Sequence, residues 1–519
     1  MPKPNSIGLD QSNRYIIEEK NYNRDELKEK HDDWIELMTS EQRAIYDEIM
    51  VAVLNDCGGV FFVYCFGGTG KTFMWKTLSA AVRYRGLIAI NVASSGIASL
   101  LLEGGRTAHS RFCIPINPDD FTTCNINPTS DLAKMLKEAS LIIWDEAPMM
   151  SRYCFENLDR SLSDIMRNAD NKPFGGKVVV FGGDFRQVLP LINGAGRAQT
   201  VLASLNSSYL WEHCKVLSLT KNMRLMSKNM TEIEARNIKE FSDWILAVGD
   251  GKIPETNDGE ALIDIPEELL ITDVVDPIDS IIRAVYGDLE MLHTKTDPKF
   301  FQTRAILCPT NSDVNTINER LLEKLQGEEM VYLSADSIDP QDSESLNNPV
   351  FSSDFLNSIK LSGLPNHSLH LKIGAPVMLL RNIDHKGGLC SVTRLQITQM
   401  GINVLEACVI TGERVGEKVL IPKVLIKPTD TKLPFRMRRR QFPLSVAFAM
   451  TINKSQGQSL EEVGLFLPRP VFSHGQLYVA LSRVTSKKGL KVLILDKDGG
   501  TTKQTMNVVF KEIFQNLWK

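Results

Sequence analysis

The stretch from Val60 to Thr72, which reads VFFVYCFGGTGKT, decides the fold of this chain. Its first six residues form an apolar run of the length of a buried strand, and glycines follow directly. After Thr72, apolar and small residues recur with the spacing of one helix face, which predicts a helix. These residues are Phe73, Met74, Thr77, Leu78, Ala81 and Val82.

A strand, a glycine loop and a helix in this order are typical of a P-loop that binds nucleotide phosphates. The glycines let backbone N–H groups point at a phosphate, and the helix N-terminus adds partial positive charge. Lys71 would reach the β- and γ-phosphates of ATP, and the Thr72 hydroxyl would ligate Mg²⁺. The alternative is a glycine-rich turn that binds nothing. The expected nucleotide-binding residues of the loop are Gly67, Gly68, Thr69, Gly70, Lys71 and Thr72.

Cys65 stands where the motif G-x-x-x-x-G-K-[ST] has its first glycine. A small side chain fits there if the backbone has ordinary β-region angles. If the corner needs a positive φ angle, the Cβ atom strains the loop. The sequence leaves both alternatives open.

Length and composition indicate a globular protein of several domains. The chain has 519 residues, of which 43% are hydrophobic and 24% charged, with a net charge of −4. This length predicts about three or four domains. No apolar run approaches the roughly 20 residues of a membrane span, and acidic residues near the N-terminus argue against a signal peptide or mitochondrial presequence. Nine cysteines without a C-x-x-C pair indicate free thiols, so we expect an intracellular protein.

Four more apolar strands are predicted in the first half, and helical segments alternate with them. They begin at Leu87, Leu141, Val178 and Val216. This alternation predicts an α/β fold with a parallel sheet covered by helices. The loops after these strands should lie at the same sheet edge as the P-loop.

Two acids, Asp145 and Glu146, end the strand that begins at Leu141. In a P-loop ATPase the first acid holds Mg²⁺ through its water shell, and the second activates the water that attacks the γ-phosphate. Two charges at the end of a buried strand are costly without a metal ion or a donor. We therefore prefer these roles to the alternative of a solvated strand end.

The other loops hold further polar candidates. Ser95 follows the second strand, and His109 could contact a DNA phosphate or base, although a lone histidine is more often structural. Gln187 follows the fourth strand, where it could sense the γ-phosphate. Arg224 follows the fifth strand and could supply charge to the transition state, with a solvated arginine as the alternative. Gln42, in the first turn of a helix, could pair with an adenine edge or simply cap that helix.

The composition divides the chain into six segments. They are an N-terminal arm at 1–30, a first α/β domain at 31–225, a helical connector at 226–300, a second α/β domain in two parts at 301–384 and 448–519, and an all-β insertion at 385–447. Within the insertion, arginines at 436, 438, 439 and 440 could form a phosphate-contacting patch or a localisation signal. A solvated hairpin is the alternative that we prefer.

Taken in order, these segments resemble the motif set of superfamily-one DNA helicases, specifically the Pif-one-like family in the same broad group as RecD. The matching positions are Gln42 for the adenine-reading motif, Gly67 to Thr72, Ser95, Asp145-Glu146 and Gln187 for motifs I to III, and Arg224, Thr451 to Gly457 and Gln476 to Arg483 for the remaining motifs. The likeness runs from about Leu37 to Leu495. Asn21-Tyr22-Asn23 and Ile452-Asn453-Lys454 look more like plant-type and Helitron-transposon helicases. Related chains often have Asn-Gly where this chain has Ser391-Val392.

The resemblance implies two RecA-like domains with ATP and Mg²⁺ between them, a small wedge insertion in the first and an SH3-like insertion in the second. It implies 5′-to-3′ translocation on single-stranded DNA and unwinding of tailed duplexes by a nuclear protein in repair, recombination or telomere maintenance, and we expect a monomer. Arg483 would be an arginine finger that acts with Lys71, Glu146, Gln187 and Arg224. Gly457 would lie at the nucleotide, and Ser95, His109, Thr451 and Lys454 would contact DNA.

Two other functions fit the same residues. The first is a translocase that hydrolyses ATP on DNA without separating strands. The second is a catalytically silent DNA-binding remnant of a mobile element, an alternative that the departure at Cys65 motivates.

Overall fold

The computed structural model describes residues 13–167, 171–192, 194–226, 230–254, 259–287, 297–346, 348, 350–361, 363–384, 387–412, 414–428 and 433–517. The chain folds into two compact units. The first comprises Met1–Asp184, Pro190–Arg224 and Ile513–Lys519, and the second comprises Phe185–Leu189 and Leu225–Glu512.

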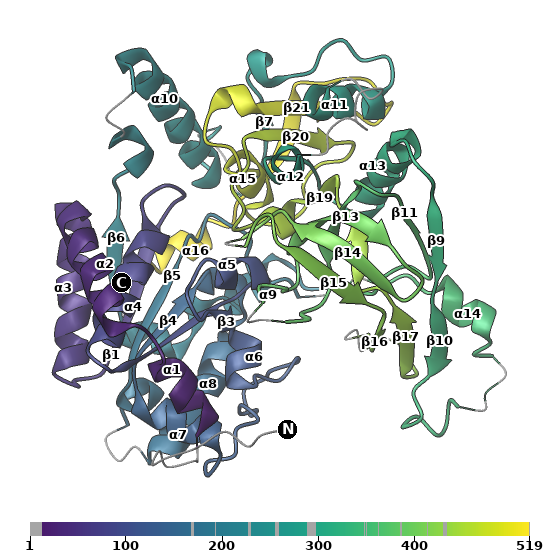
Figure 1. Cartoon of the computed structure of the whole chain (residues 1–519). Coiled ribbons are helices and arrows are strands. Elements are labelled where there is room, and N and C mark those ends of the chain that lie inside the picture. Colours follow the sequence, from purple (N-terminus) through teal and green to yellow (C-terminus); the bar gives the residue numbers. More distant parts are fainter. Residues whose placement is uncertain are drawn as a thin grey trace. The chain divides into compact units, whose positions relative to one another are not determined.

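The first unit is built on a six-stranded parallel sheet with the strand order β3-β2-β4-β5-β1-β6. Figure 1 labels β1, β3, β4, β5 and β6 in this unit. Its strands are β1 (Gly59–Cys65), β2 (Ile88–Ala93), β3 (Arg106–Thr107), β4 (Ala139–Asp145), β5 (Val178–Gly183) and β6 (Cys214–Leu219). The five predicted strands are all present, and the two-residue β3 extends the sheet at its edge. The predicted α/β class is therefore confirmed for this unit.

Helices cover both faces of this sheet. On one face, α3 (Ser40–Leu54) and α4 (Lys71–Tyr84) share a buried apolar cluster with the strands, in which Trp75 and Leu78 are fully buried. On the other face, Phe155 of α8 (Arg152–Met166) packs edge-on against Phe181 of β5. The shorter helices of the unit are α5 (Gly96–Leu100), α6 (Ala108–Phe112), α7 (Asp131–Glu138) and α9 (Arg197–Leu202).

The N-terminal arm is helical from residue 14 onward, and its first twelve residues lie outside the described part. Helix α1 (Arg14–Lys20) is capped by Asn13, and α2 (Arg24–Leu37) is capped by Asn23. Glu19 of α1 is buried and accepts a hydrogen bond from Arg111 of α6. The sequence showed no period here because the arm docks through polar groups, as the buried Glu19 illustrates.

The second unit has a four-stranded parallel sheet with the order β19-β8-β20-β21. Its strands are β8 (Arg304–Cys308), β19 (Ala449–Thr451), β20 (Glu462–Leu467) and β21 (Leu490–Ile494), and its helices include α10 (Glu232–Gly249), α11 (Pro277–Tyr286), α12 (Pro298–Gln302), α13 (Asn311–Lys324) and α15 (Gln476–Leu481). Ile281 and Ile282 of α11 are fully buried in its core. The segment predicted as a connector thus supplies part of this core. It also supplies β7 (Glu260–Asp264), which pairs with β22 (Gln504–Val508).

The β-rich part of the second unit begins well before residue 385. A five-stranded antiparallel sheet has the order β15-β14-β13-β12-β18, and smaller sheets pair β10-β17-β16 and β11-β9. The strands are β9 (Met330–Leu333), β10 (Ala335–Ile338), β11 (Ser368–Leu371), β12 (Pro376–Leu379), β13 (Arg394–Met400), β14 (Val404–Val409), β15 (Lys418–Pro422), β16 (Val424–Ile426), β17 (Met437–Gln441) and β18 (Leu444–Val446), and the short helix α14 (Ser353–Ser358) follows β10. The sequence analysis assigned β9 to β12 to the second α/β domain, because strands of only four residues are too short to show a clear alternating pattern.

The arginine run covers the residue before β17 and three residues of that strand. Its members differ in burial, so the predicted solvated hairpin is wrong for one of them. Arg436 and Arg440 are exposed, whereas Arg439 is fully buried and forms a salt bridge with Asp336 of β10. A charge run in sequence does not reveal which side of a strand meets a buried partner.

The last helix, α16 (Glu512–Gln515), and the residues after it return to the first unit. Asn206 donates to the Ile513 carbonyl at 2.7 Å, and the Trp211 indole donates to the Asn516 carbonyl at 2.9 Å. The predicted boundary at 519 does not anticipate this return. Among the described residues, no helix is both long and apolar enough to cross a membrane.

Candidate nucleotide and nucleic-acid site

The loop between β1 and α4 uses two of its glycines for backbone geometry. Gly68 has φ = 97° and Gly70 has φ = 85°, in the left-handed region that favours glycine. A Cβ atom on Gly70 would lie 2.5 Å from the Gln42 amide nitrogen, and one on Gly68 would lie 2.9 Å from the Asn222 carbonyl oxygen. A Cβ on Gly67 would meet nothing within 4 Å, so the loop itself does not require glycine there.

Cys65 occupies the corner without strain. It is the last residue of β1, pairs with Leu219 of β6, and is absent from the residues with positive φ. Its side chain is buried, and burial raises the pKa of the thiol to about 12. The first of the two alternatives for this corner therefore holds, because the backbone has strand geometry.

Lys71, the first residue of α4, is held by the two acids at the end of β4. Its ammonium lies 2.7 Å from an oxygen of Asp145 and 2.7 Å from an oxygen of Glu146. Burial alone would lower the pKa of Lys71, but the two carboxylates outweigh it and raise the pKa well above its usual value. Only 3% of the Asp145 side chain and 9% of the Glu146 side chain are exposed, so the alternative of a solvated strand end is wrong.

These groups fit ATP and Mg²⁺. The loop presents glycine backbone and an ammonium for phosphate, while Asp145 and Thr72 offer oxygen atoms of the kind that Mg²⁺ prefers. Among the described residues, no group of three or more His, Cys, Asp and Glu side chains could hold a metal ion alone. Because Mg²⁺ usually keeps several water ligands and binds substrate phosphates, Asp145 and Thr72 would supply only part of its coordination.

Gln42 links helix α3 to the P-loop. Its amide oxygen accepts from the Thr39 N–H at 3.1 Å, and its amide nitrogen donates to the Thr69 carbonyl at 3.0 Å. The capping alternative from the sequence is thus observed. Adenine reading stays a prediction, which would use the second amide hydrogen and the second lone pair of the same group.

Arg224 lies over the P-loop within the first unit. Its Nε atom would be 3.2 Å from a Cβ atom on Gly68, and the neighbouring Met223 N–H donates to the Gly68 carbonyl at 2.8 Å. The Oδ1 atom of the Asn222 side chain accepts a hydrogen bond from the backbone N–H of Arg224 at 3.1 Å. This geometry places the Arg224 side chain, which is half-buried, beside the loop that would hold the phosphates, and its catalytic role stays a prediction.

Two other predicted catalytic residues, Gln187 and Arg483, belong to the second unit. The side-chain amide of Gln456 donates to the Gln187 Oε1 atom at 2.6 Å, and both side chains are buried. The Arg483 guanidinium donates to the carbonyls of Val479, at 2.8 Å, and Gln458, at 3.0 Å. Its role as an arginine finger stays a prediction.

The predicted DNA-contacting residues are divided between the two units. In the first unit, Ser95 caps α5 by accepting from the Ala98 N–H at 3.2 Å, and His109 lies exposed on α6. In the second unit, Thr451 ends β19 and Lys454 lies in the turn that follows it. Gly457 closes that turn with φ = 82°. Their DNA contacts stay predictions.

Two family models match the chain and show to which protein family it belongs. A model of the PIF1-like helicase matches residues 37–259, and a model of the DNA helicase Pif1 2B domain matches residues 354–400. The chain belongs to the PIF1-like helicases. The first match contains the P-loop and both acids, and the second lies in the β-rich part of the second unit.

Individual relatives have the same family name. The chain is 28% identical over 440 residues to the ATP-dependent DNA helicase PIF1 of Xenopus laevis, covering 83% of this chain and 58% of that protein. It is 27% identical over 489 residues to that of Danio rerio, covering 92% of this chain and 64% of that protein. The chain thus spans about three fifths of the length of these relatives. The plant and Helitron affinity stays a prediction.

A solved structure supports the fold. The crystal structure of Bacteroides Pif1 bound to ssDNA superposes with a TM-score of 0.60 at 23% identity, covering 89% of this chain and 93% of that one. At this identity the likeness shows the fold. The PIF1-like chain therefore has the predicted fold of two RecA-like domains, and its β-rich insertion lies in the second unit.

The sequence analysis missed two residues that shape this helicase site. The Asn222 side chain lies close to Gly68 of the P-loop, and the Gln456 side chain donates a hydrogen bond to the Gln187 side chain. Both lie inside stretches that the sequence singled out, two residues before Arg224 and one before Gly457. Their amide side chains lack charge, so composition and motif spacing did not mark them.

Proposed function

We propose that the chain is an ATP-dependent DNA helicase that couples ATP hydrolysis to 5′-to-3′ translocation on single-stranded DNA and to unwinding of tailed duplexes. The observation that carries this proposal is the buried Lys71 ammonium 2.7 Å from both Asp145 and Glu146, directly after the two left-handed glycines. A lysine after β1 and two acids at the end of β4, at the same edge of the sheet, form the charge arrangement of a P-loop ATPase.

The chemistry would proceed through the residues at the ends of β1 and β4. Lys71 is charged at neutral pH and would exchange its carboxylate partners for phosphate oxygens, which frees Asp145 to hold Mg²⁺ together with Thr72. Bound Mg²⁺ would neutralise charge on the phosphates. Glu146 would then accept the proton of the attacking water, and Arg224 would stabilise negative charge as it develops.

The second unit would supply the coupling to DNA. The hydrogen bond from Gln456 to Gln187 joins the loop predicted to sense the γ-phosphate to the segment Thr451–Gly457, which is predicted to contact DNA. Arg483 donates to the Ser455 and Gln458 carbonyls of the same region. We propose that Arg483 and Gln187 respond together when DNA changes the conformation of this segment.

The test measures ATP hydrolysis with and without single-stranded DNA, followed by unwinding of duplexes with either a 5′ or a 3′ tail. We expect DNA to stimulate hydrolysis, and we expect unwinding only of the 5′-tailed duplex. Lys71→Ala should abolish DNA-stimulated hydrolysis and leave DNA binding intact, whereas Lys134→Ala, at an exposed pair with Asp131, should change neither. Unchanged turnover in Lys71→Ala would refute the site.

The same assays separate the two alternative functions. A translocase without strand separation would hydrolyse ATP on single strands and leave both tailed duplexes paired. A silent remnant would show no turnover, and Cys65→Gly would be the variant expected to restore it. The strand geometry of Cys65 favours an active loop. Action in the nucleus, in repair, recombination or telomere maintenance, is a further proposal that imaging of the tagged protein would check first.

A further inference from the structure

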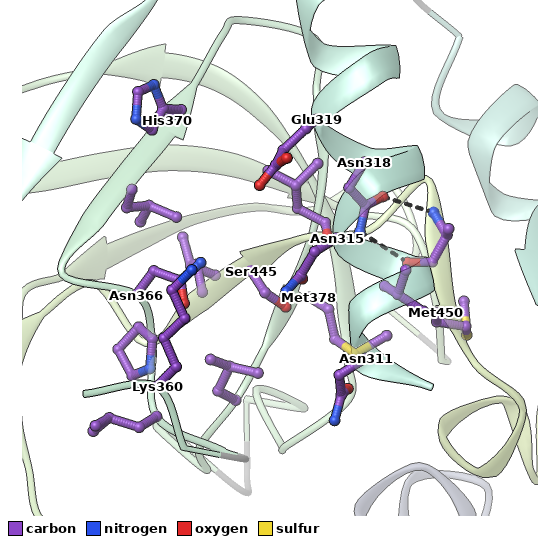
Figure 2. Close-up of a pocket in the computed structure, with 18 of the residues that line it drawn as sticks. Asn311, Asn315, Asn318, Glu319, Lys360, Asn366, His370, Met378, Ser445 and Met450 are labelled. Atoms are coloured by element: carbon purple, nitrogen blue, oxygen red, sulfur yellow. Dashed lines mark hydrogen bonds between the residues drawn. The ribbon is translucent and has the colours of Figure 1, made fainter. Parts of the chain in front are cut away.

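A groove in the second unit lies between helix α13 and the segment at 360–370 (Figure 2). Its volume is about 320 Å³, within the range of small-ligand pockets. Asn311, Asn315 and Glu319 are spaced four residues apart on α13 and therefore form one wall. Lys360 and Asn366 line the opposite side.

The floor of the groove is apolar and firmly held. Met378, Leu444 and Leu369 are buried and line it. Beneath the wall, Asn318 donates to the Val446 carbonyl at 2.9 Å and accepts from the Ala449 N–H at 2.8 Å. These bonds fix α13 to β18 and β19, so the groove is preformed.

The polar groups at the rim are available to a ligand. Among the residues that the structure describes, none forms a hydrogen bond or ion pair with the side chains of Asn311, Asn315, Glu319, Lys360 or Asn366. Amides and a carboxylate above an apolar floor suit a flat ring that has hydrogen-bonding edges. A nucleobase has this combination of an apolar face and a polar edge.

Lys454 adds a cation to the lining of the groove. It lies in the turn after β19, its side chain has no ion pair within the described part of the chain, and burial lowers the pKa of its ammonium. A partly desolvated ammonium next to a ring-sized groove suits the phosphate of the same nucleotide. The lysine also lies in the segment Thr451–Gly457, so the groove is continuous with the predicted DNA-contacting turn.

We propose that this groove takes one nucleotide of a DNA strand, with its base on the apolar floor and its phosphate beside Lys454. The inference rests on the proposed function. The Glu319 carboxylate can only accept hydrogen bonds. Cytosine offers it an amino group, whereas thymine has a carbonyl oxygen at the same position. The groove therefore prefers cytosine to thymine.

The test compares binding of oligo-dC and oligo-dT strands of equal length by fluorescence anisotropy. The wild-type chain should bind oligo-dC about fivefold more tightly, since one well-placed base contact contributes discrimination of this order. Glu319→Gln should remove this preference, because an amide can both donate and accept. Glu323→Gln is the matched control, since Glu323 is exposed one turn later on α13 and does not line the groove.

A second variant distinguishes a loss of DNA contact from a loss of folding. Asn315→Ala should weaken binding of both strands about threefold with an unchanged circular-dichroism melting curve, because it removes one rim amide. Equal affinities of wild type for the two strands, or an undiminished cytosine preference in Glu319→Gln, would overturn the groove assignment while DNA-stimulated ATP hydrolysis persisted. Loss of that stimulation in the wild-type chain would instead overturn the proposed function.

Discussion

The two units each bury an ion pair, and the pairs differ in how they are held. In the first unit, the Lys71 ammonium meets Asp145 and Glu146, and 14% of the lysine side chain is exposed. In the second unit, Arg439 and Asp336 are both fully buried. The Arg439 guanidinium makes three contacts of 2.6–3.0 Å to the Asp336 carboxylate and also donates to the Leu356, Ile359 and Pro365 carbonyls.

The Lys71 ion pair can exchange its partners, whereas the Arg439–Asp336 ion pair cannot. Lysine presents a point charge on a flexible stem, so Lys71 can exchange a carboxylate for a phosphate at little geometric cost. Arginine presents a rigid fork, and every exchange at Arg439 would leave a buried carboxylate or carbonyl without a donor. We infer that the first pair serves chemistry and the second serves the stability of the β-rich part.

The largest effect is expected from neutralising Asp145, one of the two acids that bind Lys71. Asp145→Asn should lower the DNA-stimulated rate of ATP hydrolysis by about 1,000-fold, because a charge placed for the transition state is lost. The melting temperature should change little, since Lys71 keeps Glu146 as a partner. Steady-state turnover and thermal melting measure the two quantities. A large drop in stability with normal turnover would reverse the assignment.

The matching change in the Arg439–Asp336 ion pair should lower stability and leave turnover unchanged. Asp336→Asn should destabilise the protein by about 3–5 kcal/mol, because it leaves the Arg439 charge buried without compensation. Turnover at temperatures where the chain remains folded should be unchanged. Asp354→Asn, at an exposed position of α14, is the control. Urea unfolding measures the difference, and replacing Arg439 and Asp336 together by Met and Leu should recover much of the loss.

A smaller effect is expected at a strained turn of the same β-rich part. Val392, between β12 and β13, has φ = 74°, which is costly for a β-branched residue. Val392→Gly should therefore stabilise the second unit by about 1 kcal/mol. Val404→Gly, in strand geometry on β14, should instead destabilise it, and equal signs in urea unfolding would contradict the strain.

The smallest expected effect concerns pH and the Lys71 pair. The pKa of Lys71 is raised in the folded chain, so its contribution to stability is complete below the unfolded pKa of about 10.4. The contribution is lost only as pH rises through the higher folded pKa. The difference in unfolding free energy between wild type and Lys71→Met should thus stay constant from about pH 6 to 9. A slope in this interval would show that Lys71 is not held as a charged group.

Sequence reasoning predicted the first unit well because its strands are buried on both faces. Strands β1 and β4 contain continuous apolar runs, which are followed by glycines after Cys65 and by acids at Asp145. Such runs predict both the strand and the loop that follows it. The β-rich part was predicted less well. Its strands from Met330 to Leu379 have four residues each, and those before β12 are partly exposed, so their pattern resembles that of loops or of an α/β edge.

The amino-acid sequence by itself determined the α/β class, the P-loop and the family motifs, because these depend on local spacing along one or two elements. Only the tertiary structure decided that Cys65 is unstrained, that Arg439 is buried against Asp336, and that residues after Ile513 return to the first unit. Each of these depends on what another segment, distant in sequence, brings to the same place. Local patterns record the spacing of side chains but not the identity of such partners.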